Sequence, residues 1–268
     1  MTTNNNKIRN SQGNEKMIPK IIFQTWKTHQ VPEKWKSSPL SIKRYMPHWK
    51  HVLFSDEDNE RFVEEHFPEY IEFYKKLRFP IQKADFIRYC FLYVYGGVYS
   101  DLDIEFTSPI DHLFKIENEH DLVYLLKAPQ NFAGHFTNFF MASSPKNSFW
   151  LLVLRECVEH LPAWVILPHH IISEQTGLAC LSRAARKILS ENRLDTRIVE
   201  LPFNNLVPCD ICSYSSEKKP FYYTKFLKGQ SWNGFDTLLF NFFICNTLEV
   251  FLGLVVLFVV AKYRKIIL

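Results

Sequence analysis

The sequence lacks several features that define large classes of protein. Residues 1–16 contain no apolar run, so they do not indicate a signal peptide. The 32 Lys and Arg residues are mixed with 28 Asp and Glu residues, without the basic blocks typical of a nucleic-acid groove. The six cysteines have no framework spacing. These absences argue against a nucleic-acid partner and against a disulfide-stabilised module.

The composition is that of one large folded domain with additions at its ends. The chain has 268 residues, of which 47% are hydrophobic and 16% aromatic, enough for a substantial core. Residues 1–16 are polar and rich in Asn, and we expect a disordered lead. We expect the main domain over residues 17–237, a membrane segment over 242–261 and a basic tail over 262–268.

The most informative stretch joins a helix to a pair of acids. Apolar and aromatic residues at helical spacing predict a helix from Ile81 to Tyr95, ended by Gly96-Gly97 as a left-handed cap. The alternation from Val98 to Ile104 predicts a strand. In an extended segment, Asp101 and Asp103 point to the same side.

Two neighbouring carboxylates favour a cation. Like charges at close range raise each other's pKa unless a cation lies between them, and hard ions such as Mn²⁺ or Mg²⁺ prefer oxygen ligands. Asp101 and Asp103 therefore indicate half of a metal site. We assign the acids of Ser55–Asp58 to helix capping and not to metal binding. A Ser or Asp N-cap followed by acids in the first turn is the usual start of a helix.

The order of elements predicts a mixed α/β fold with a largely parallel sheet. Ile18–Trp26 reads as the first strand and Lys50–Ser55 as the second, with helices after each. Ligands bind at the carboxyl ends of strands in open α/β sheets, which makes Gln24, Thr25 and Trp26 candidate binding residues. Trp26 could stack on a nucleotide base or pack against the core or a lid.

Asp85 and Arg88 stand three residues apart on the central helix and share a face. Such a pair is either a structural ion pair or part of the site. In the second case Asp85 would accept from sugar hydroxyls and Arg88 would face a phosphate.

The segment from Phe242 to Ala261 is long and apolar enough to span a bilayer of about 30 Å. A buried helix or an interfacial hairpin is the alternative. The basic tail favours a cytoplasmic C-terminus, whereas the absent N-terminal signal favours a cytoplasmic domain with a tail anchor. Cys209 and Cys212 form a lone CxxC, more typical of a local disulfide or free thiols than of a zinc site.

Two long runs, Ile18–Trp26 and Ala84–Asp103, resemble glycosyltransferase family 32, the DXD sugar transferases. That family includes the fungal initiating α-1,6-mannosyltransferase and the mannosyl inositol phosphorylceramide synthases. The similarity extends from Ile18 to the C-terminus, and Ser231–Asp236 is similar to the Ser-Trp-His-Gly stretch of the sphingolipid enzymes. The resemblance implies a glycosyltransferase-A fold, a nucleotide-sugar donor (GDP-mannose or a UDP-hexose), Mn²⁺ or Mg²⁺ on the DXD acids, and retention of configuration.

The resemblance also implies roles for the residues of this sequence that match the family's motifs. It implies that Trp26 stacks near the base, that Asp85 and Arg88 hold the donor sugar, and that Asp101 and Asp103 hold metal and diphosphate. Further substrate-binding residues are Gln24, Thr25, Tyr99, Asn138, Ser231 and Trp232, of which Ser231 and Trp232 would close over the phosphates. Three positions depart from the family pattern: Lys225–Lys228 lacks the histidine often found there, Phe139 replaces an acid, and Asn147 replaces a histidine.

The sequence thus predicts a membrane-anchored, metal-dependent retaining hexosyltransferase, with mannose as the first choice of sugar. By resemblance we expect it in Golgi-type endomembranes. Ser231-Trp232 lies ten residues before Phe242, which favours a lipid headgroup over a glycoprotein glycan as acceptor and would bring Lys225 and Lys228 near anionic headgroups. Two other functions stay open: a sugar-nucleotide-binding or glycan-binding module without catalysis, and a metal-dependent phosphoesterase.

Overall fold

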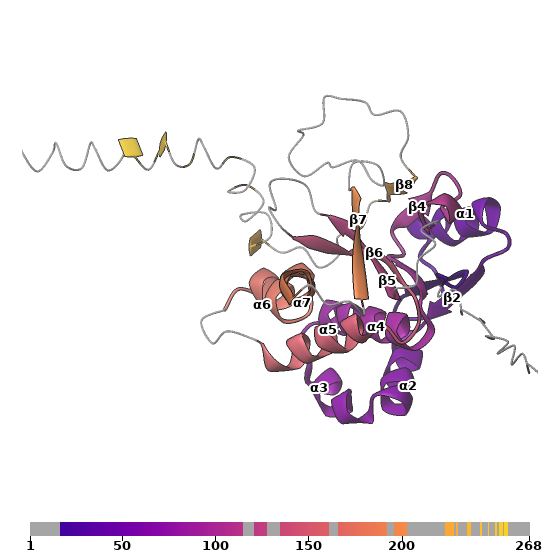
Figure 1. Ribbon diagram of the computed structural model, residues 1–268. Helices are drawn as coiled ribbons and strands as arrows, with labels where there is room; N and C mark the ends of the chain where they lie inside the picture. Colours follow the sequence, from indigo (N-terminus) through magenta and orange to yellow (C-terminus); the bar gives the residue numbers. More distant parts are fainter. Residues whose placement is uncertain are drawn as a thin grey trace, which may run out of the picture.

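The computed structural model describes residues 17–114, 121–127, 135–160, 166–191, 196–202, 223–227, 229, 235–236 and seven positions between 242 and 256. These residues form a mixed α/β domain, which confirms the predicted class (Figure 1). Several predictions fall outside the described residues: the disordered lead, the Cys209/Cys212 pair, Lys228, the Ser231-Trp232 lid and the basic tail.

A six-stranded sheet in the order β2-β1-β3-β6-β5-β7 forms the centre of the domain. Its strands are β1 (Ile21–Thr25), β2 (Lys50–Phe54), β3 (Gly97–Ser100), β5 (Asp121–Lys127), β6 (Phe136–Ser143) and β7 (Thr196–Pro202). β1 is parallel to β2 and β3, and β5 is parallel to β7. β6 runs antiparallel to both β3 and β5, so the expectation of a largely parallel sheet holds only on either side of β6.

Seven α-helices are described around this sheet: α1 (Ser37–Tyr45), α2 (Asp56–His66), α3 (Ile71–Lys76), α4 (Pro80–Tyr95), α5 (Ser148–Glu159), α6 (Pro168–Gln175) and α7 (Leu178–Glu191). Three short 3₁₀ turns, η1 (Glu33–Trp35), η2 (Pro68–Tyr70) and η3 (Asp111–Phe114), connect them. α7 begins at Leu178, directly after Gly177, which donates its N–H to the carbonyl of Ile172 in α6 (2.8 Å).

The sheet has a different cover on each face, as the alternation of its strands requires. Phe23, Tyr99 and Met141 belong to the core formed with α2, α3, α4, α5 and α7. Ile22 and Val98, their neighbours in sequence, face the opposite way into a smaller core with residues of α1. Figure 1 accordingly shows α2 to α5 below the sheet, α6 and α7 at its left, and α1 apart from them at the right.

The start of α2 confirms the capping prediction. The Ser55 hydroxyl accepts the N–H of Asp58 (3.2 Å), and the Asp58 carboxylate accepts the N–H of Ser55 (2.9 Å). Both interactions satisfy backbone donors that a helix start leaves unpaired. The acids of this turn are therefore used for helix capping.

The end of α4 also follows the prediction, but the strand after it does not. Gly96 and Gly97 have φ angles of +64° and +84°, and α4 ends at Tyr95. The prediction of a continuous strand from Val98 to Ile104 is wrong. The chain turns after β3, and the N–H of Ile104 donates a hydrogen bond to the carbonyl of Asp101 (3.2 Å). The turn lets β4 (Ile104–Phe106) leave the main sheet and pair with β8 (Thr224–Phe226).

Within the part of the chain that the structure describes, no helix combines the length and the apolarity needed to cross a bilayer. Most positions of 242–261 lie outside that part. The membrane segment stays a prediction.

Gly97 allows β3 and β1 to approach closely, and we predict that Gly97→Ala destabilises the fold. A Cβ there would lie 2.4 Å from Cγ2 and 2.7 Å from the carbonyl oxygen of Ile21. Steric overlap and the positive φ together should cost ~2 to 4 kcal/mol in the free energy of unfolding, measured by urea denaturation. Gly253→Ala is the matched control, because no atom lies within 4 Å of its Cβ position. Equal unfolding midpoints for the two variants would contradict the prediction.

Candidate active site

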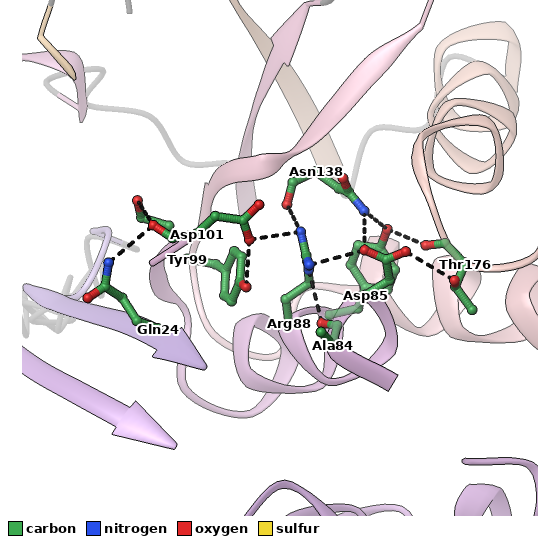
Figure 2. Close-up of polar contacts among 10 residues, drawn as sticks. Gln24, Ala84, Asp85, Arg88, Tyr99, Asp101, Asn138 and Thr176 are labelled. Carbon is green, nitrogen blue, oxygen red and sulfur yellow. Dashed lines mark hydrogen bonds and ion pairs between the residues drawn. The ribbon is translucent and has the colours of Figure 1, made fainter. Parts of the chain in front are cut away.

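The Asp101–Asp103 turn lies at the carboxyl end of β3, next to the carboxyl end of β1. Gln24, near the end of β1, donates its side-chain N–H to the carbonyl of Asp101 (3.2 Å) and to the hydroxyl of Ser38 in α1 (2.9 Å). Figure 2 shows Gln24 directed toward Asp101 from the side opposite Arg88. The turn is thus fixed where ligands bind in open α/β sheets.

The carboxylate of Asp101 is held by two side chains on one of its oxygens. The Tyr99 hydroxyl donates to Oδ1 (2.8 Å), and Nη1 of Arg88 lies 3.2 Å from the same atom. No side chain among the described residues contacts Oδ2 by a hydrogen bond or ion pair. One carboxylate oxygen is therefore positioned by the protein and the other is available to a ligand.

Arg88 is buried, with 2% of its side chain exposed, and its donors are directed at the protein (Figure 2). Nε donates to the carbonyl of Ala84 (3.0 Å), and Nη1 donates to the carbonyl of Asn138 (2.7 Å). Nη2 forms an ion pair with Asp85 (3.1 Å). Burial lowers the pKa of Arg88, but Asp101, Tyr99 and Asp85 outweigh burial and raise it, so the guanidinium keeps its charge.

Asp85 is equally buried and uses both carboxylate oxygens. Oδ1 accepts from the Asn138 amide (2.9 Å) and pairs with Arg88, while Oδ2 accepts from the Thr176 hydroxyl (3.1 Å). Burial raises the pKa of Asp85 to about 6, although Arg88 lowers it. The structure therefore places Asp85, Arg88, Tyr99, Asp101 and Asn138 in one connected network, as Figure 2 shows.

Asp103 has no such compensation. No cationic side chain among the described residues pairs with its carboxylate, and its backbone carbonyl accepts the N–H of Leu227 (2.7 Å). Burial, followed by the negative charge of Asp101, raises the pKa of Asp103 to about 7. Gly229 lies against it, since a Cβ at that position would be 2.0 Å from Oδ2 of Asp103.

These two carboxylates fit a hard divalent cation. Within the described residues there is no cluster of three or more His, Cys, Asp or Glu side chains that could hold a metal. Mg²⁺ and similar ions commonly take only one or two protein carboxylates, and phosphates and water complete the coordination. The free oxygen of Asp101 and the uncompensated carboxylate of Asp103 supply that number of ligands.

The remaining predicted residues lie along the same edge of the sheet. Gln24 is fully buried, and the Thr25 hydroxyl accepts from the Asn59 amide (2.7 Å). Trp26 is partly buried and meets the Trp35 ring edge-on at 4.7 Å between ring centroids. Gln24 thus supports the turn.

The three departures from the family pattern have structural partners here. Phe139 packs on Phe226 (5.1 Å between ring centroids), and its carbonyl accepts the N–H of Asp101 (2.9 Å). Asn147 caps α5 by accepting the N–H of Phe149 (2.9 Å). Lys225 forms an ion pair with Glu105 (2.9 Å), which joins β8 to β4 next to the site.

Sequence reasoning missed two residues that touch the acids, Thr176 and Gly229. The contact of Thr176 with Asp85 spans 91 residues. The available signal for Thr176 was its position directly before Gly177, the glycine that ends α6. A glycine two residues before Ser231 was the signal for Gly229.

Comparison with known proteins defines the class of this domain. Residues 32–120 match the family described as the glycosyltransferase sugar-binding region containing the DXD motif. This match confirms the resemblance to the DXD sugar transferases seen in the sequence.

Two curated relatives come from Saccharomyces cerevisiae. Mannosyl phosphorylinositol ceramide synthase CSH1 is 29% identical over 221 residues, which cover 82% of this chain and 54% of that protein. Mannosyl phosphorylinositol ceramide synthase SUR1 is 34% identical over 166 residues, 62% of this chain and 41% of that protein. This chain therefore spans about half the length of the curated relatives it matches.

A solved structure supports the fold independently. The ligand-free glycosyltransferase domain of the YGT toxin superposes with a TM-score of 0.52, over 69% of this chain and 81% of that one. At 8% sequence identity this likeness concerns the fold alone.

Arg88 should be essential to the stability of the site. We predict that Arg88→Met lowers the free energy of unfolding by ~3 to 5 kcal/mol, because it leaves Asp85 and Asp101 as buried charges without a counter-ion. Urea denaturation measures the loss, and Lys76→Met, which breaks the exposed Lys76–Glu72 pair, should cost less than about 1 kcal/mol. Asp85→Asn added to Arg88→Met should cost less than the sum of the two single variants. Strict additivity would contradict this coupling.

Proposed function

We propose that this protein is a metal-dependent, retaining glycosyltransferase with a glycosyltransferase-A fold that transfers mannose from GDP-mannose to a lipid headgroup. One observation carries the proposal: the Asp101–Asp103 turn presents one carboxylate fixed by Arg88 and Tyr99 beside a second that forms no ion pair with a cationic side chain among the described residues. A nucleoside diphosphate with its Mn²⁺ or Mg²⁺ supplies the missing positive charge and the missing ligands. The choice of mannose rests on the relatives, which are named mannosyl phosphorylinositol ceramide synthases, and the choice of GDP as the donor nucleotide rests on the family resemblance.

The protein residues would contribute mainly by positioning. Asp101 and Asp103 would hold the cation, which neutralises charge developing on the departing diphosphate. Arg88 and Asp85 would fix Asp101 from the buried side and limit the donor-sugar end of the site. Trp26, at the end of β1, would lie near the base. Such prepositioned groups lower the barrier without reorganising during the reaction.

Retention of configuration would come from front-face attack. A double displacement needs a free nucleophile, and the buried carboxylate of Asp85 already uses both oxygens in contacts with Arg88, Asn138 and Thr176. The acceptor hydroxyl would then attack from the side of the departing diphosphate, and a diphosphate oxygen would take its proton. In this proposal Asp85 is a positioning residue.

The position of Gly229 supports the proposed lid. Ser231 is two residues beyond Gly229, which touches Asp103, and two residues reach at most about 7 Å. Ser231-Trp232 would therefore close over the diphosphate. With a membrane anchor at 242–261, the site would lie near the bilayer surface, where a lipid-linked headgroup such as an inositol phosphoceramide enters. Golgi-type endomembranes are the compartment we propose.

Direct assay of the two acids tests the function. Purified protein with Mn²⁺ should transfer labelled mannose from GDP-mannose to an inositol phosphoceramide in vesicles, and Asp101→Asn and Asp103→Asn should each lower the rate by at least about 100-fold. Glu72→Gln, at an exposed acid on α3, should keep the wild-type rate.

Three outcomes would contradict the proposal. Equal rates for wild type and both aspartate variants would exclude the metal assignment. Donor binding by calorimetry without transfer to any tested acceptor would indicate a binding module. Release of inorganic phosphate, where transfer leaves GDP, would indicate a phosphoesterase.

Gly229 offers a second test that leaves the acids unchanged. We predict that Gly229→Ala abolishes Mn²⁺-dependent stabilisation by GDP-mannose in thermal denaturation, because the added Cβ occupies the space of the Asp103 carboxylate. In wild type a ligand at ~100 times its Kd should add about 2.7 kcal/mol to the free energy of unfolding. The unliganded variant should unfold at the wild-type temperature to within a few degrees. Undiminished ligand stabilisation in Gly229→Ala would show that residue 229 does not adjoin the donor site.

A further inference from the structure

Positive charge is concentrated at the start of the domain, although it is balanced over the whole chain. Residues 17–50 contain seven Lys and Arg residues and a single acid, Glu33. The following residues, 51–76, contain eight Asp and Glu residues and three Lys and Arg residues. Basic and acidic residues are therefore segregated into two adjacent parts of the chain, although they are balanced over the chain as a whole.

Three of these basic residues, Lys36, Lys43 and Arg44, lie in or directly beside α1. Within the helix, Lys43 and Arg44 follow Leu40 by three and four residues, so these exposed positions share one face, and the exposed Lys36 and Pro47 lie just before and just after the helix. We call these five residues the basic face. The opposite side of α1 is buried through Ser38, Ser41 and Ile42. Leu40, at the centre of the basic face, keeps 64% of its surface exposed.

The charges on this face are largely uncompensated. Lys36 pairs with Glu33 at 2.5 Å, but no carboxylate among the described residues forms an ion pair with Lys43 or Arg44. A cavity of about 340 Å³ lies beside Leu40, with Met46, Pro47 and Trp49 in its lining. Leu40 therefore exposes apolar surface next to two cations that form no ion pair among the described residues, a combination that suits a membrane interface.

We propose that the basic face of α1 docks on an anionic lipid bilayer. Lys43 and Arg44 contact lipid phosphates and carboxylates, and Leu40 enters the headgroup region. This inference deepens the proposed function, because it supplies a surface that holds the domain against the membrane in which a lipid acceptor resides. A bilayer offers anionic phosphates and apolar chains side by side, which matches two cations that flank the exposed Leu40.

The basic face is connected rigidly to the acids of the site. The Ser38 hydroxyl donates to the carbonyl of Ile104 (2.5 Å), and the Ser37 hydroxyl donates to Glu105 (2.5 Å). Ser38 also accepts from Gln24, which holds the carbonyl of Asp101. Docking through α1 therefore sets the orientation of the Asp101–Asp103 turn relative to the bilayer, independently of any C-terminal anchor.

Vesicle flotation of the full-length protein, without nucleotide sugar, tests the proposal. The vesicles consist of phosphatidylcholine alone or of equal parts phosphatidylcholine and phosphatidylserine. Wild type should prefer the anionic vesicles, and added salt should weaken this preference. At ~1 kcal/mol for each basic residue near the surface, Lys43→Glu/Arg44→Glu should weaken binding to anionic vesicles by at least about 25-fold. Leu40→Gln should weaken binding while leaving its salt dependence unchanged.

The matched control reverses two adjacent lysines on α3, Lys75→Glu/Lys76→Glu, which Figure 1 shows at the opposite side of the domain from α1. It changes net charge equally and should bind anionic vesicles like wild type. All variants contain residues 242–261, so a contribution from that segment is common to them. Equal binding by both double variants, or a wild type indifferent to phosphatidylserine, would overturn the proposal. Because no sugar transfer is measured, the result does not depend on catalysis.

Discussion

The site depends on one buried guanidinium. Arg88 lies between Asp85 and Asp101 and donates to two backbone carbonyls, so a charge that would cost several kcal/mol to bury alone is compensated on every side. Its partners come from α4 itself, from the turn after β3 and from β6, which follows 50 residues later. Arg88 is thus the point at which three elements are joined, and the direction of Asp101 follows from it.

The sheet order makes this arrangement possible. β1 lies between β2 and β3, so the end of β1 adjoins the end of β3, and Gln24 reaches Asp101. The Gly96-Gly97 turn brings the end of α4 directly back into β3 and keeps Arg88 close to the acids that follow. The antiparallel strand β6 then supplies Asn138, whose amide and carbonyl contact Asp85 and Arg88. Local turns and sheet topology together determine which carboxylate oxygens of Asp101 and Asp103 are free to bind a ligand.

What the sequence predicted well was local. The end of α4 at Tyr95 and the capping box at Ser55 depend on residues within one turn, so periodicity and residue type were sufficient. The DXD acids and the Asp85–Arg88 pair were also recognised from spacing. The resemblance to DXD sugar transferases extended the candidate list to Tyr99 and Asn138, which do join the network.

What the sequence did not predict depends on contacts between distant residues. The alternation of Val98–Ile104 resembles a single strand, but β4 leaves the sheet because β8, more than a hundred positions later, offers a partner. The contact of Thr176 with Asp85 spans 91 residues and has no signature in the local pattern of either residue. The burial of Arg88 is another such property, because the carbonyl of Asn138 is 50 residues away.

The pairing of β4 with β8 has a consequence for how the protein matures. The strand that follows the acids is completed by Thr224–Phe226, and the backbone of Asp103 is held by Leu227. During synthesis the ribosome has made nearly the whole domain before either partner exists. The acids can then reach their final geometry only at the last stage of folding, since contacts of such sequence separation form late and slowly. A chain arrested or clipped before β8 would expose the unpaired edge of β4, a surface prone to aggregation and suited to chaperone recognition.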